Sequence, residues 1–590
     1  MTYDPSIAWA VLTAKTPTSG RTEREAWRYI LDATESYPTG VYQPPLKAPR
    51  YSEKPKPIGG LRWEYETPGD PTSAPVALSI ACGAESGRLV FTGDPAADTA
   101  ALADVLIMPA LKSALLASWG WSAGGANGFL HYFARAFTRI GWTIDPIASG
   151  SICKALILRH KRRAIWLTDA QEMIGGQALT LEQFTSEYAP RSVNAADSAQ
   201  RLAEALGAYQ RQTLGMFGVA LHATIGAAAL RAASCYVPED KWVWRPNPLM
   251  VAMSRTAHGF RGGYSYAQAY DGPAYQADIS KAYTSALVGD IPHRSALVPA
   301  GIKWQGQPGI YLCRLSGFGK LPIYIAPWRG KAEGFTPEYW SGGRALAVLS
   351  STEYPGIRAL GYTIEQLGGY VHISTWTLAP FAQRIAEICA AHGRASAHER
   401  TAKVIGNAVY GKFAQRPDHE DVRYSAASPG AEWFPMIDQR GNEVPDLWTS
   451  QTITHRPGQH VDIAATITGR VRSWLYTALA DTLDAGGQIV HADTDGFLST
   501  IDPSAQLDTT ADKLGAWRVG AQPDRAIVWG RKAYAFGDEV RAAGFSGLTA
   551  ADGMEIASGG TVETYYMATP APWKSGAGAV LTKRLARATA

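Results

Sequence analysis

The sequence predicts a multidomain protein that mixes α/β and α+β architecture. Its 590 residues leave room for three or four domains. From Leu61 to about residue 205, apolar strand runs alternate with amphipathic helical patterns, which is typical of an α/β domain. Between about 300 and 372, strand runs alternate with Gly/Pro turns, which indicates an inserted α+β subdomain. The hydrophobic fraction of 46% and charged fraction of 18% are those of a soluble globular protein.

Charge and cysteine content set few limits on function. The formal net charge of +4 does not by itself indicate nucleic-acid binding. The five cysteines are scattered without a Cys-x-x-Cys pair, so neither a zinc site nor a disulfide framework is expected. The N-terminus has no signal-peptide pattern, and no run of about 18 apolar residues suggests a membrane span. We therefore expect a cytoplasmic protein without membrane contact.

The predicted elements follow from hydrophobic periodicity and from Gly/Pro punctuation. Residues before about 60 form an extended arm or linker, apart from a helix near Arg21–Thr34. Strands are expected at Pro75–Cys82, Gly87–Thr92, Tyr275–Ile279 and Gln488–Asp493. Helices are expected at Ala97–Leu111, Gly128–Ile140, Ala195–Met216, Leu378–His392, Glu399–Phe413 and Ala464–Ala485. The stretch 414–460 is predicted to be rich in loops.

Three aspartates lie at the ends of predicted apolar strands. Asp278 ends one strand, and Asp493 and Asp495 lie in the strand–turn–strand Ile489–Leu498. Residues two apart on an extended chain point to one face, so both carboxylates of Asp-Thr-Asp can enter one site. Carboxylates from two strands can hold two Mg²⁺ or Mn²⁺ ions about 4 Å apart for phosphoryl transfer. Alone, Asp-Thr-Asp would indicate only a surface turn.

A polar stripe lies on the predicted helix Glu399–Phe413. Lys403, Asn407 and Tyr410 are four and three residues apart and share one helical face. A solvated helix face is the simplest interpretation, but a cation among polar groups also suits a triphosphate, with Arg394 and Arg400 as secondary candidates. The order and spacing of the stripe and the three aspartates favour templated nucleotide addition by a nucleic-acid polymerase.

These motifs closely resemble the three polymerase motifs of family B DNA polymerases. That family carries Asp-x-x-Ser-Leu-Tyr-Pro-Ser, then Lys-x-x-x-Asn-Ser-x-Tyr-Gly, then Tyr-x-Asp-Thr-Asp-Ser. The matching residues are Asp278, Tyr283, Ser285, Lys403, Asn407, Tyr410, Gly411, Asp493, Thr494 and Asp495. The resemblance implies a right-hand polymerase with palm, fingers and thumb, behind an N-terminal RNase H-like 3′–5′ exonuclease-type domain. It also implies dNTP addition to a 3′-hydroxyl, or to a protein hydroxyl, on a DNA template and primer.

The resemblance assigns metal and nucleotide roles. Asp278 and Asp495 would be the main metal ligands, with Asp493 weaker and the Ile279 backbone as a further ligand. Tyr283 would lie under the incoming sugar and exclude ribonucleotides.

Further residues resemble the elements that hold primer and template. Lys281, where Ser is usual, either reaches a triphosphate oxygen or forms a surface ion pair. Other departures are Thr284, Ala408, His491 and Gly496, and none removes a metal ligand. Primer and template contacts are expected from Lys532, Tyr534, Arg261, Gly262, Gly263 and Thr494.

The resemblance is closest to the protein-primed branch of phages and linear plasmids. Tyr410-Gly-Lys-Phe-Ala and Arg261-Gly-Gly-Tyr are written as in that branch. The stretches 300–372 and 414–460 stand where it carries two terminal-protein regions. This adds a terminal priming protein to the expected partners, and strand displacement by a monomer to the expected properties.

The exonuclease motifs are degenerate. Glu64 replaces Asp in Asp-x-Glu, Asn127 replaces Asp in Phe-Asp-Gly, and only the Asp of Tyr-x-x-x-Asp remains. An amide binds Mg²⁺ far more weakly than a carboxylate, and misplacement by about 1 Å can cost roughly a hundredfold in rate. We expect a retained domain with little or no proofreading, unless Asp104 or Asp145 supplies the second motif. The expected remnants are Glu64, Glu66, Asn127 and Asp197.

The expected domains follow from these assignments. They are an N-terminal extension (1–60), exonuclease-like domain (61–205), connector (206–258), first palm part (259–300), inserted subdomain (301–372), fingers (373–413), second insertion (414–460), second palm part (461–540), and thumb with basic tail (541–590). Alternatives are a primer-independent or lesion-tolerant relative, a glycosyltransferase using Asp-x-Asp, and an inactive DNA-binding scaffold. A reverse transcriptase would show adjacent aspartates.

Overall fold

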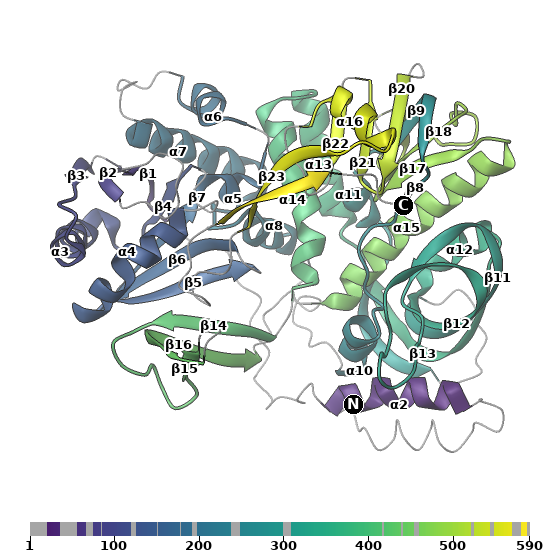
Figure 1. Ribbon diagram of the computed structural model, residues 1–590, viewed down its shortest axis with the longest axis horizontal. Helices are drawn as coiled ribbons and strands as arrows, with labels where there is room; N and C mark the ends of the chain where they lie inside the picture. Colours follow the sequence, from purple (N-terminus) through teal and green to yellow (C-terminus); the bar gives the residue numbers. More distant parts are fainter. Residues whose placement is uncertain are drawn as a thin grey trace.

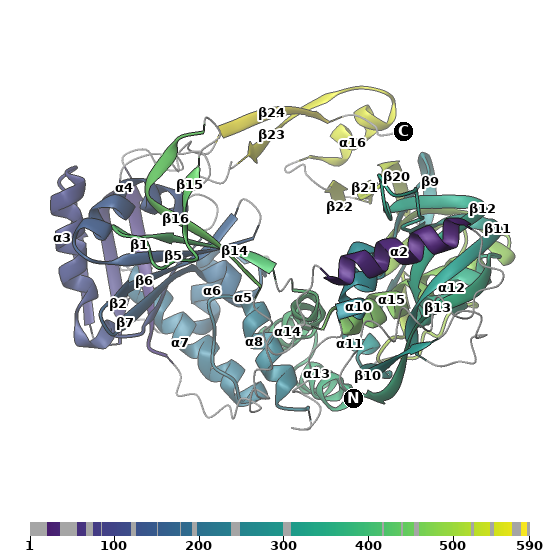
Figure 2. The same cartoon turned by 90° about the horizontal axis from the view of Figure 1, so that it is seen from below.

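The computed structural model describes most of the chain. The described residues are 21–35, 56–65, 75–83, 85–119, 125–149, 152–177, 179–190, 198–237, 248–298, 308–415, 418–437, 441–453, 460–511, 513–520, 524–537, 539–542, 548–568 and 580–586. The elements follow an arch in Figure 2, from the N-terminal domain through α13 and α14 to the palm sheet, with β23 and β24 above. Among the described residues, no helix is long and apolar enough to cross a membrane.

The N-terminal domain is a mixed sheet covered by helices. Three central strands, β1 (Ile58–Tyr65), β4 (Leu115–Ser118) and β7 (Arg163–Asp169), run parallel. The antiparallel strands are β2 (Pro75–Cys82), β3 (Glu85–Val90), β5 (Thr143–Ser149) and β6 (Ile152–His160). The helices are α3 (Pro95–Leu106), α4 (Gly125–Arg139), α5 (Ala170–Ile174), α6 (Leu181–Tyr188) and α7 (Ser198–Phe217). This alternation is the predicted α/β domain.

The aromatic side chains of α4 form the core of this domain. Phe129, Phe133 and Phe137 recur every four residues, so they lie on one face of the helix. All three are buried; Phe129 and Phe133 pack on Trp63, and Phe133 also packs on Phe91. The apolar stripe of the sequence therefore fixes which face of α4 covers the sheet.

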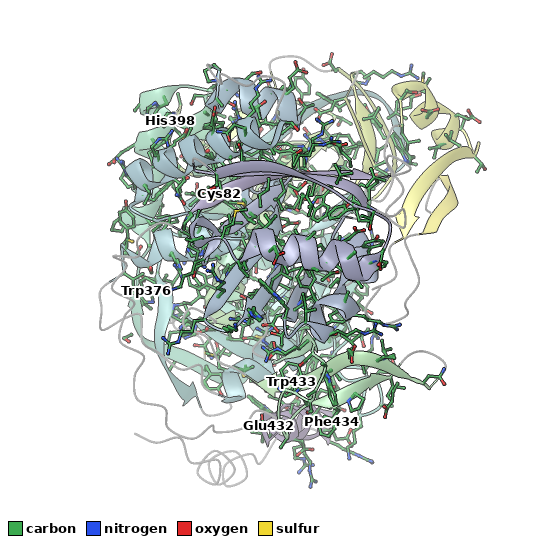
Figure 3. All side chains as sticks on the ribbon, turned by 90° about the vertical axis from the view of Figure 1, so that its left-hand side faces the viewer. Cys82, Trp376, His398, Glu432, Trp433 and Phe434 are labelled. Atoms are coloured by element: carbon green, nitrogen blue, oxygen red, sulfur yellow. The ribbon has the colours of Figure 1, made fainter. Side chains whose placement is uncertain are left out.

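The stretch 414–460 contains strands rather than mainly loops, which corrects the sequence prediction. β14 (Asp418–Tyr424), β15 (Phe434–Ile437) and β16 (Glu443–Ile453) are antiparallel, and β14 pairs with β5 through Tyr424 and Ile144. The sheet thereby reaches ten strands in the order β15-β16-β14-β5-β6-β7-β4-β1-β2-β3. We call residues 418–453 the insertion hairpin; Figure 1 shows it beside β5, and Figure 3 shows Glu432, Trp433 and Phe434 at its edge.

Polar contacts fasten the insertion hairpin to the N-terminal domain. Arg423 donates to both oxygens of Asp145, with Nε 2.5 Å from Oδ1 and Nη2 3.0 Å from Oδ2. The Thr138 hydroxyl donates to Asp446 at 3.2 Å. Tyr424 is buried in the same core as the α4 aromatics. The insertion hairpin is therefore an integral part of the N-terminal sheet.

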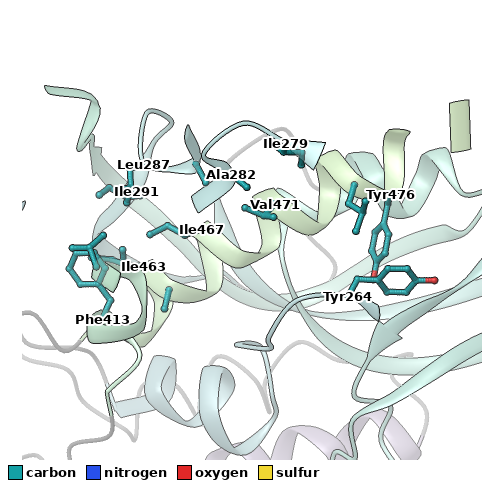
Figure 4. Close-up of a cluster of buried hydrophobic side chains, with 14 of the residues drawn as sticks. Tyr264, Ile279, Ala282, Leu287, Ile291, Phe413, Ile463, Ile467, Val471 and Tyr476 are labelled. Atoms are coloured by element: carbon teal, nitrogen blue, oxygen red, sulfur yellow. The ribbon is translucent and has the colours of Figure 1, made fainter. Parts of the chain in front are cut away.

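The palm is an eight-stranded antiparallel sheet packed on one long helix. Its order is β22-β21-β20-β9-β18-β17-β8, with β19 also paired to β9. The strands are β8 (Ser265–Ala267), β9 (Tyr270–Ile279), β17 (Ile489–Asp493), β18 (Gly496–Ser499), β19 (Trp517–Val519), β20 (Asp524–Gly530), β21 (Ala533–Phe536) and β22 (Glu539–Ala542). Ile463, Ile467 and Val471 line one side of α15 (Val461–Asp484), as Figure 4 shows, and are buried against the short helix α11 (Ala282–Ala286) and its surroundings.

The inserted subdomain is a four-stranded antiparallel sheet. Its order is β10 (Ile291–Val298), β13 (Thr363–Trp376), β11 (Gly309–Ile325) and β12 (Glu338–Ser350). A 3-10 turn at Ser351–Glu353 and α12 (Tyr354–Ala359) follow β12. The predicted N-terminal helix is α2 (Arg21–Glu35), and its buried face joins one core with β11 and β12. The sheet thus begins at Ile291, before the expected boundary at 301.

The remaining elements lie between these three sheets in the sequence or follow the palm. They are α8 (Ile225–Ser234), α10 (Pro248–Val251), a π-helical turn (Ala252–Thr256), α13 (Ala379–His392), α14 (Ala397–Phe413), α16 (Ala550–Ala557), β23 (Val562–Ala568) and β24 (Val580–Ala586). The two helices predicted near 378–413 are confirmed as α13 and α14. Lys583 and Arg584 of the basic C-terminal stretch lie on β24, paired with β23.

Candidate functional site

Strand pairing places Asp278 beside Asp495. Asp278 lies opposite Gly496 in the β9–β18 ladder, and the Ile279 N–H donates to the Asp495 carbonyl at 2.8 Å. A Cβ atom added at Gly496 would lie 2.1 Å from Oδ1 of Asp278. Glycine at this position therefore leaves the space that the Asp278 carboxylate occupies.

The turn between the two strands positions Asp493. Thr494 has φ +62°, and its N–H donates to the Tyr264 carbonyl at 2.7 Å. Its hydroxyl donates to Oδ1 of Asp493 at 2.9 Å, and Lys532 Nζ lies 3.0 Å from the same oxygen. A Cβ at Gly263 would lie 2.6 Å from the Thr494 hydroxyl oxygen. The Arg-Gly-Gly junction is thus packed directly against the Asp-Thr-Asp turn.

The carboxyl groups of Asp495 and Asp278 both have pKa values above the ordinary range. Burial, and then the neighbouring Asp278 and Asp493, raise the pKa of Asp495 to about 6. Burial also raises the pKa of Asp278, against the charges of Arg518 and Arg541 and a 3.0 Å hydrogen bond from Gln276. Two raised carboxyl pKa values side by side favour a site that a cation completes.

Asp278 and Asp495 are suitable for holding Mg²⁺ or Mn²⁺. Their carboxylates, at the end of β9 and in the β17–β18 turn, are hard oxygen donors, which these ions prefer. Within the described ranges, no group of three His, Cys, Asp or Glu side chains is arranged to hold an ion. Asp493 is engaged by Lys532, which agrees with its expected weaker role.

Two tyrosines form a flat surface beside the aspartates. The rings of Tyr283 and Tyr410 stack with centroids 4.0 Å apart and an interplanar angle of 12°. Burial, the neighbouring Tyr410 and the charge of Asp495 raise the pKa of Tyr283, so its phenol stays protonated. The structure therefore brings the expected sugar gate and the polar stripe of α14 into contact.

The cationic part of the stripe lies at the start of α14. Lys403 forms an ion pair with Glu399, Nζ to Oε1 at 2.5 Å. Asn407 and Arg394 are exposed. Lys281 has φ +51° and begins α11, and its charge acts on Glu399. Lys281 and Lys403 therefore lie near one carboxylate.

Arg261 is buried, which does not favour its expected contact with template. Its side chain is 3% exposed and donates to both oxygens of Glu353, at 2.8 and 2.7 Å. Arg472 binds the same carboxylate and donates to the Arg261 and Gly262 carbonyls at 2.7 and 2.6 Å. The charged triad of Arg261, Glu353 and Arg472 instead holds the junction against α15.

Lys532 and Tyr534 lie next to the Asp-Thr-Asp turn. Tyr534 packs on His491, with ring centroids 4.5 Å apart. Burial lowers the pKa of His491 to about 4, so this side chain is neutral near pH 7. The two expected primer residues are thus within reach of the strand end that carries Asp493.

The exonuclease remnant is only partly described. Glu64 is the penultimate residue of β1 and pairs with Arg88 at 2.8 Å. Asp104 is exposed on α3, and Asp145 is bound by Arg159 and Arg423. Glu66 and Asp197 lie outside the described residues, as does the side chain of Asn127.

Several functional neighbours were not predicted from the sequence. Gln276 is two residues before Asp278 on β9, so the strand period could have indicated it. Arg518 faces Asp278 across the β19–β9 ladder, and no local pattern indicates that pairing. Glu353 lacks a sequence signal as well, because its partners come from distant segments.

Comparison with known proteins agrees with this geometry. The chain is 34% identical over 143 residues to a DNA-directed DNA polymerase of Enterobacteria phage PRD1, covering 22% of this chain. The match spans 23% of that relative, about a quarter of its length. No family model matches the chain.

Solved structures match the whole architecture. Phi29 DNA polymerase complexed with primer-template DNA and incoming nucleotide superposes with a TM-score of 0.66 at 16% identity, over 91% of this chain and 100% of that chain. Its orthorhombic crystal form gives 0.62 at 16% identity, with the same coverage. The fold is therefore that of a DNA polymerase with exonuclease-type, palm, fingers and thumb domains. The sequence match and the fold likeness are thus both to DNA polymerases, one from Enterobacteria phage PRD1 and the other the Phi29 DNA polymerase.

Proposed function

We propose that the protein is a DNA-directed DNA polymerase that extends a 3′-hydroxyl, or a protein hydroxyl, with dNTPs. The observation that carries this proposal is the position of Asp278 at the end of β9 beside Asp495 in the β17–β18 turn, next to the stacked Tyr283 and Tyr410. A PRD1 relative is named a DNA-directed DNA polymerase, and the Phi29 polymerase is complexed with primer-template DNA and nucleotides. DNA template, primer and dNTPs are accordingly the proposed partners.

Each residue of the site has a distinct task. Asp278 and Asp495 would hold two Mg²⁺ or Mn²⁺ ions, which supply charge neutralisation for phosphoryl transfer. Lys403 would neutralise the leaving pyrophosphate, because its ammonium group offers three donors to phosphate oxygens. Tyr410 would support the base, and Tyr283 would lie under the sugar.

Primer extension tests the proposal. The protein is incubated with Mg²⁺, dNTPs and a 5′-labelled primer on a longer template. Wild type is expected to produce a ladder, and Asp495→Ala is expected to produce none while retaining DNA affinity. Asp502→Ala, an exposed carboxylate beyond β18, is the matched control and should extend normally. Full extension by Asp495→Ala would overturn the site assignment.

The sugar gate has its own test. Tyr283→Ala removes the ring under the proposed sugar position, so the preference for dNTPs over rNTPs should fall at least tenfold. The measurement is the ratio of kcat/KM for a dNTP and its rNTP. An unchanged ratio would place the gate on another residue.

Weak or absent proofreading is part of the proposal. One observation in support is that Glu64, which stands at the position of the first exonuclease carboxylate, is paired with the guanidinium group of Arg88. Without dNTPs, the labelled primer should not shorten in Mg²⁺. Shortening that disappears in Glu64→Ala would show that the exonuclease site is functional.

Protein priming, strand displacement and a monomeric, cytoplasmic enzyme complete the proposal. The support is the likeness to the phage polymerases and the presence of strands at both insertion positions. Replacing residues 425–446 with a short turn keeps β14 while removing the tip of the insertion hairpin. This variant should extend a primed single strand but stall at a downstream duplex. Undiminished displacement would contradict the assigned role.

A further inference from the structure

A buried carboxylate lies within the proposed triphosphate site. Glu399 is 6% exposed, and its Oε1 lies 2.5 Å from Nζ of Lys403. Its Oε2 accepts the Ala395 N–H at 2.6 Å, and its own N–H donates to the Ser396 hydroxyl oxygen at 3.1 Å. These bonds fix Glu399 in the first turn of α14, so its charge stays in place when a ligand arrives.

Two lysines converge on this carboxylate. Burial opposes ionisation of Glu399, but hydrogen bonds from Lys403 and the Ala395 N–H, and then the charges of Lys403 and Lys281, hold its pKa below the usual value. The same lysines act on Cys389 of α13, whose thiol pKa is nevertheless raised by burial. Glu399 is therefore ionised near pH 7, with Lys403 as its ion-pair partner and the charge of Lys281 acting on it from the residue before α11.

We propose that Glu399 is an internal competitor for the phosphates of the incoming nucleotide. It holds Lys403 in an ion pair in the free protein and must release that ammonium group when phosphates bind. The proposal rests on the proposed polymerase function and on the assignment of Lys403 to the triphosphate.

The competition follows from charge and from fixed geometry. A triphosphate brings several negative charges to lysines that already have a carboxylate partner, and like charges at close range repel. Because Glu399 cannot swing away without giving up its bonds at the helix start, the repulsion persists in the complex. Pyrophosphate carries the same kind of charge, so Glu399 weakens product retention as well as substrate binding.

Glu399→Gln isolates the charge. The amide oxygen can still accept the Ala395 N–H, so the start of α14 is kept. The KM for each of the four dNTPs and the Ki for pyrophosphate should fall together by roughly threefold to tenfold, which is the scale of a partly exposed ion pair. Glu387→Gln on α13 is the matched control, because Glu387 forms an exposed pair with Arg384 at 3.6 Å and should leave both constants unchanged.

The outcomes distinguish the competitor role from structural and functional alternatives. Unchanged KM and Ki in an active Glu399→Gln protein would overturn the proposal. A higher KM would overturn it too, because Glu399 would then orient Lys403 for binding. A lower thermal stability with unchanged constants would show a purely structural role.

A second variant and a binding measurement complete the test. Lys281→Met should raise the KM for dNTPs, and it should reduce the effect of Glu399→Gln, because one of the two cations is gone. If wild type extends no primer, the proposed function fails, yet calorimetry of Mg²⁺–pyrophosphate binding to wild type and Glu399→Gln still tests the competitor. Equal affinities there would refute it.

Discussion

The raised pKa of Asp495 makes a quantitative prediction about stability. When folding raises the pKa of a carboxyl group, the folded state favours the protonated form of that group. Its contribution to folding is fully present below the ordinary pKa and is lost as the pH rises through about 6. At neutral pH and without metal, ionised Asp495 therefore destabilises the palm, and Asp495→Asn should relieve this while abolishing extension.

The magnitude follows from the shift. The pKa rises from 3.8 to about 6, roughly two units. At about 1.4 kcal/mol per unit, the Asn variant should be more stable by at most about 3 kcal/mol at pH 8. The difference should shrink steadily below pH 6, because the folded wild type then keeps its proton.

Hydrogen exchange is the suitable assay, because a multidomain chain does not unfold in one step. Protection of peptides covering β17 and β18 is measured at pH 5 and pH 8 in a chelator, and again with Mg²⁺. Mg²⁺ should protect wild type, since an ion that binds only the folded state stabilises it, and should leave Asp495→Asn unchanged. Equal protection of both proteins at pH 8, or a difference independent of pH, would refute the reasoning.

Three further predictions concern packing around the site. Gly496→Ala would push the Asp278 carboxylate aside, since the new Cβ would lie 2.1 Å from Oδ1, so primer extension should fall by roughly a hundredfold. Glu353→Ala leaves two buried guanidinium groups unpaired, which should cost about 3–5 kcal/mol in the unfolding of the palm by urea. Arg423→Met removes the contact with Asp145, so proteolysis of the insertion hairpin should speed up by about fivefold, the scale of one such ion pair, with unchanged extension of a primed single strand. A variant that behaves like wild type in its assay would contradict the role assigned to the corresponding contact.

The position of the three aspartates could be predicted in part from the sequence because their signals are local. Asp278 follows an apolar run and Asp493 ends one, but the extended chain expected through Asp495 is a turn in which Thr494 has φ +62°. The stripe from Lys403 to Tyr410 follows the helical period in the same way. The pair of Glu399 and Lys403 has i, i+4 spacing and could have been recognised, but its burial depends on neighbouring elements.

Contacts between distant segments were beyond the sequence. The template contact predicted for Arg261 rested on the resemblance of Arg261-Gly-Gly to the family's junction element. Its burial arises from Glu353, which the inserted subdomain brings to it. The strands of the insertion hairpin are paired with a distant segment, since Asp145 is 278 residues from Arg423. Such edge pairing has no local periodicity.

The ten-stranded sheet gives the N-terminal domain a structural task, the support of the insertion hairpin, that does not depend on its carboxylates. The N-terminal domain provides the edge, through Ile144 and Asp145, on which the insertion hairpin is seated. The strands are therefore still needed to support the insertion hairpin when the carboxylates of the domain change, as at Glu64. A truncated protein without this domain would lose the strand β5 and the Asp145 carboxylate that hold the insertion hairpin in place. The persistence of the domain is thus explained by architecture, independently of whether it still cuts DNA.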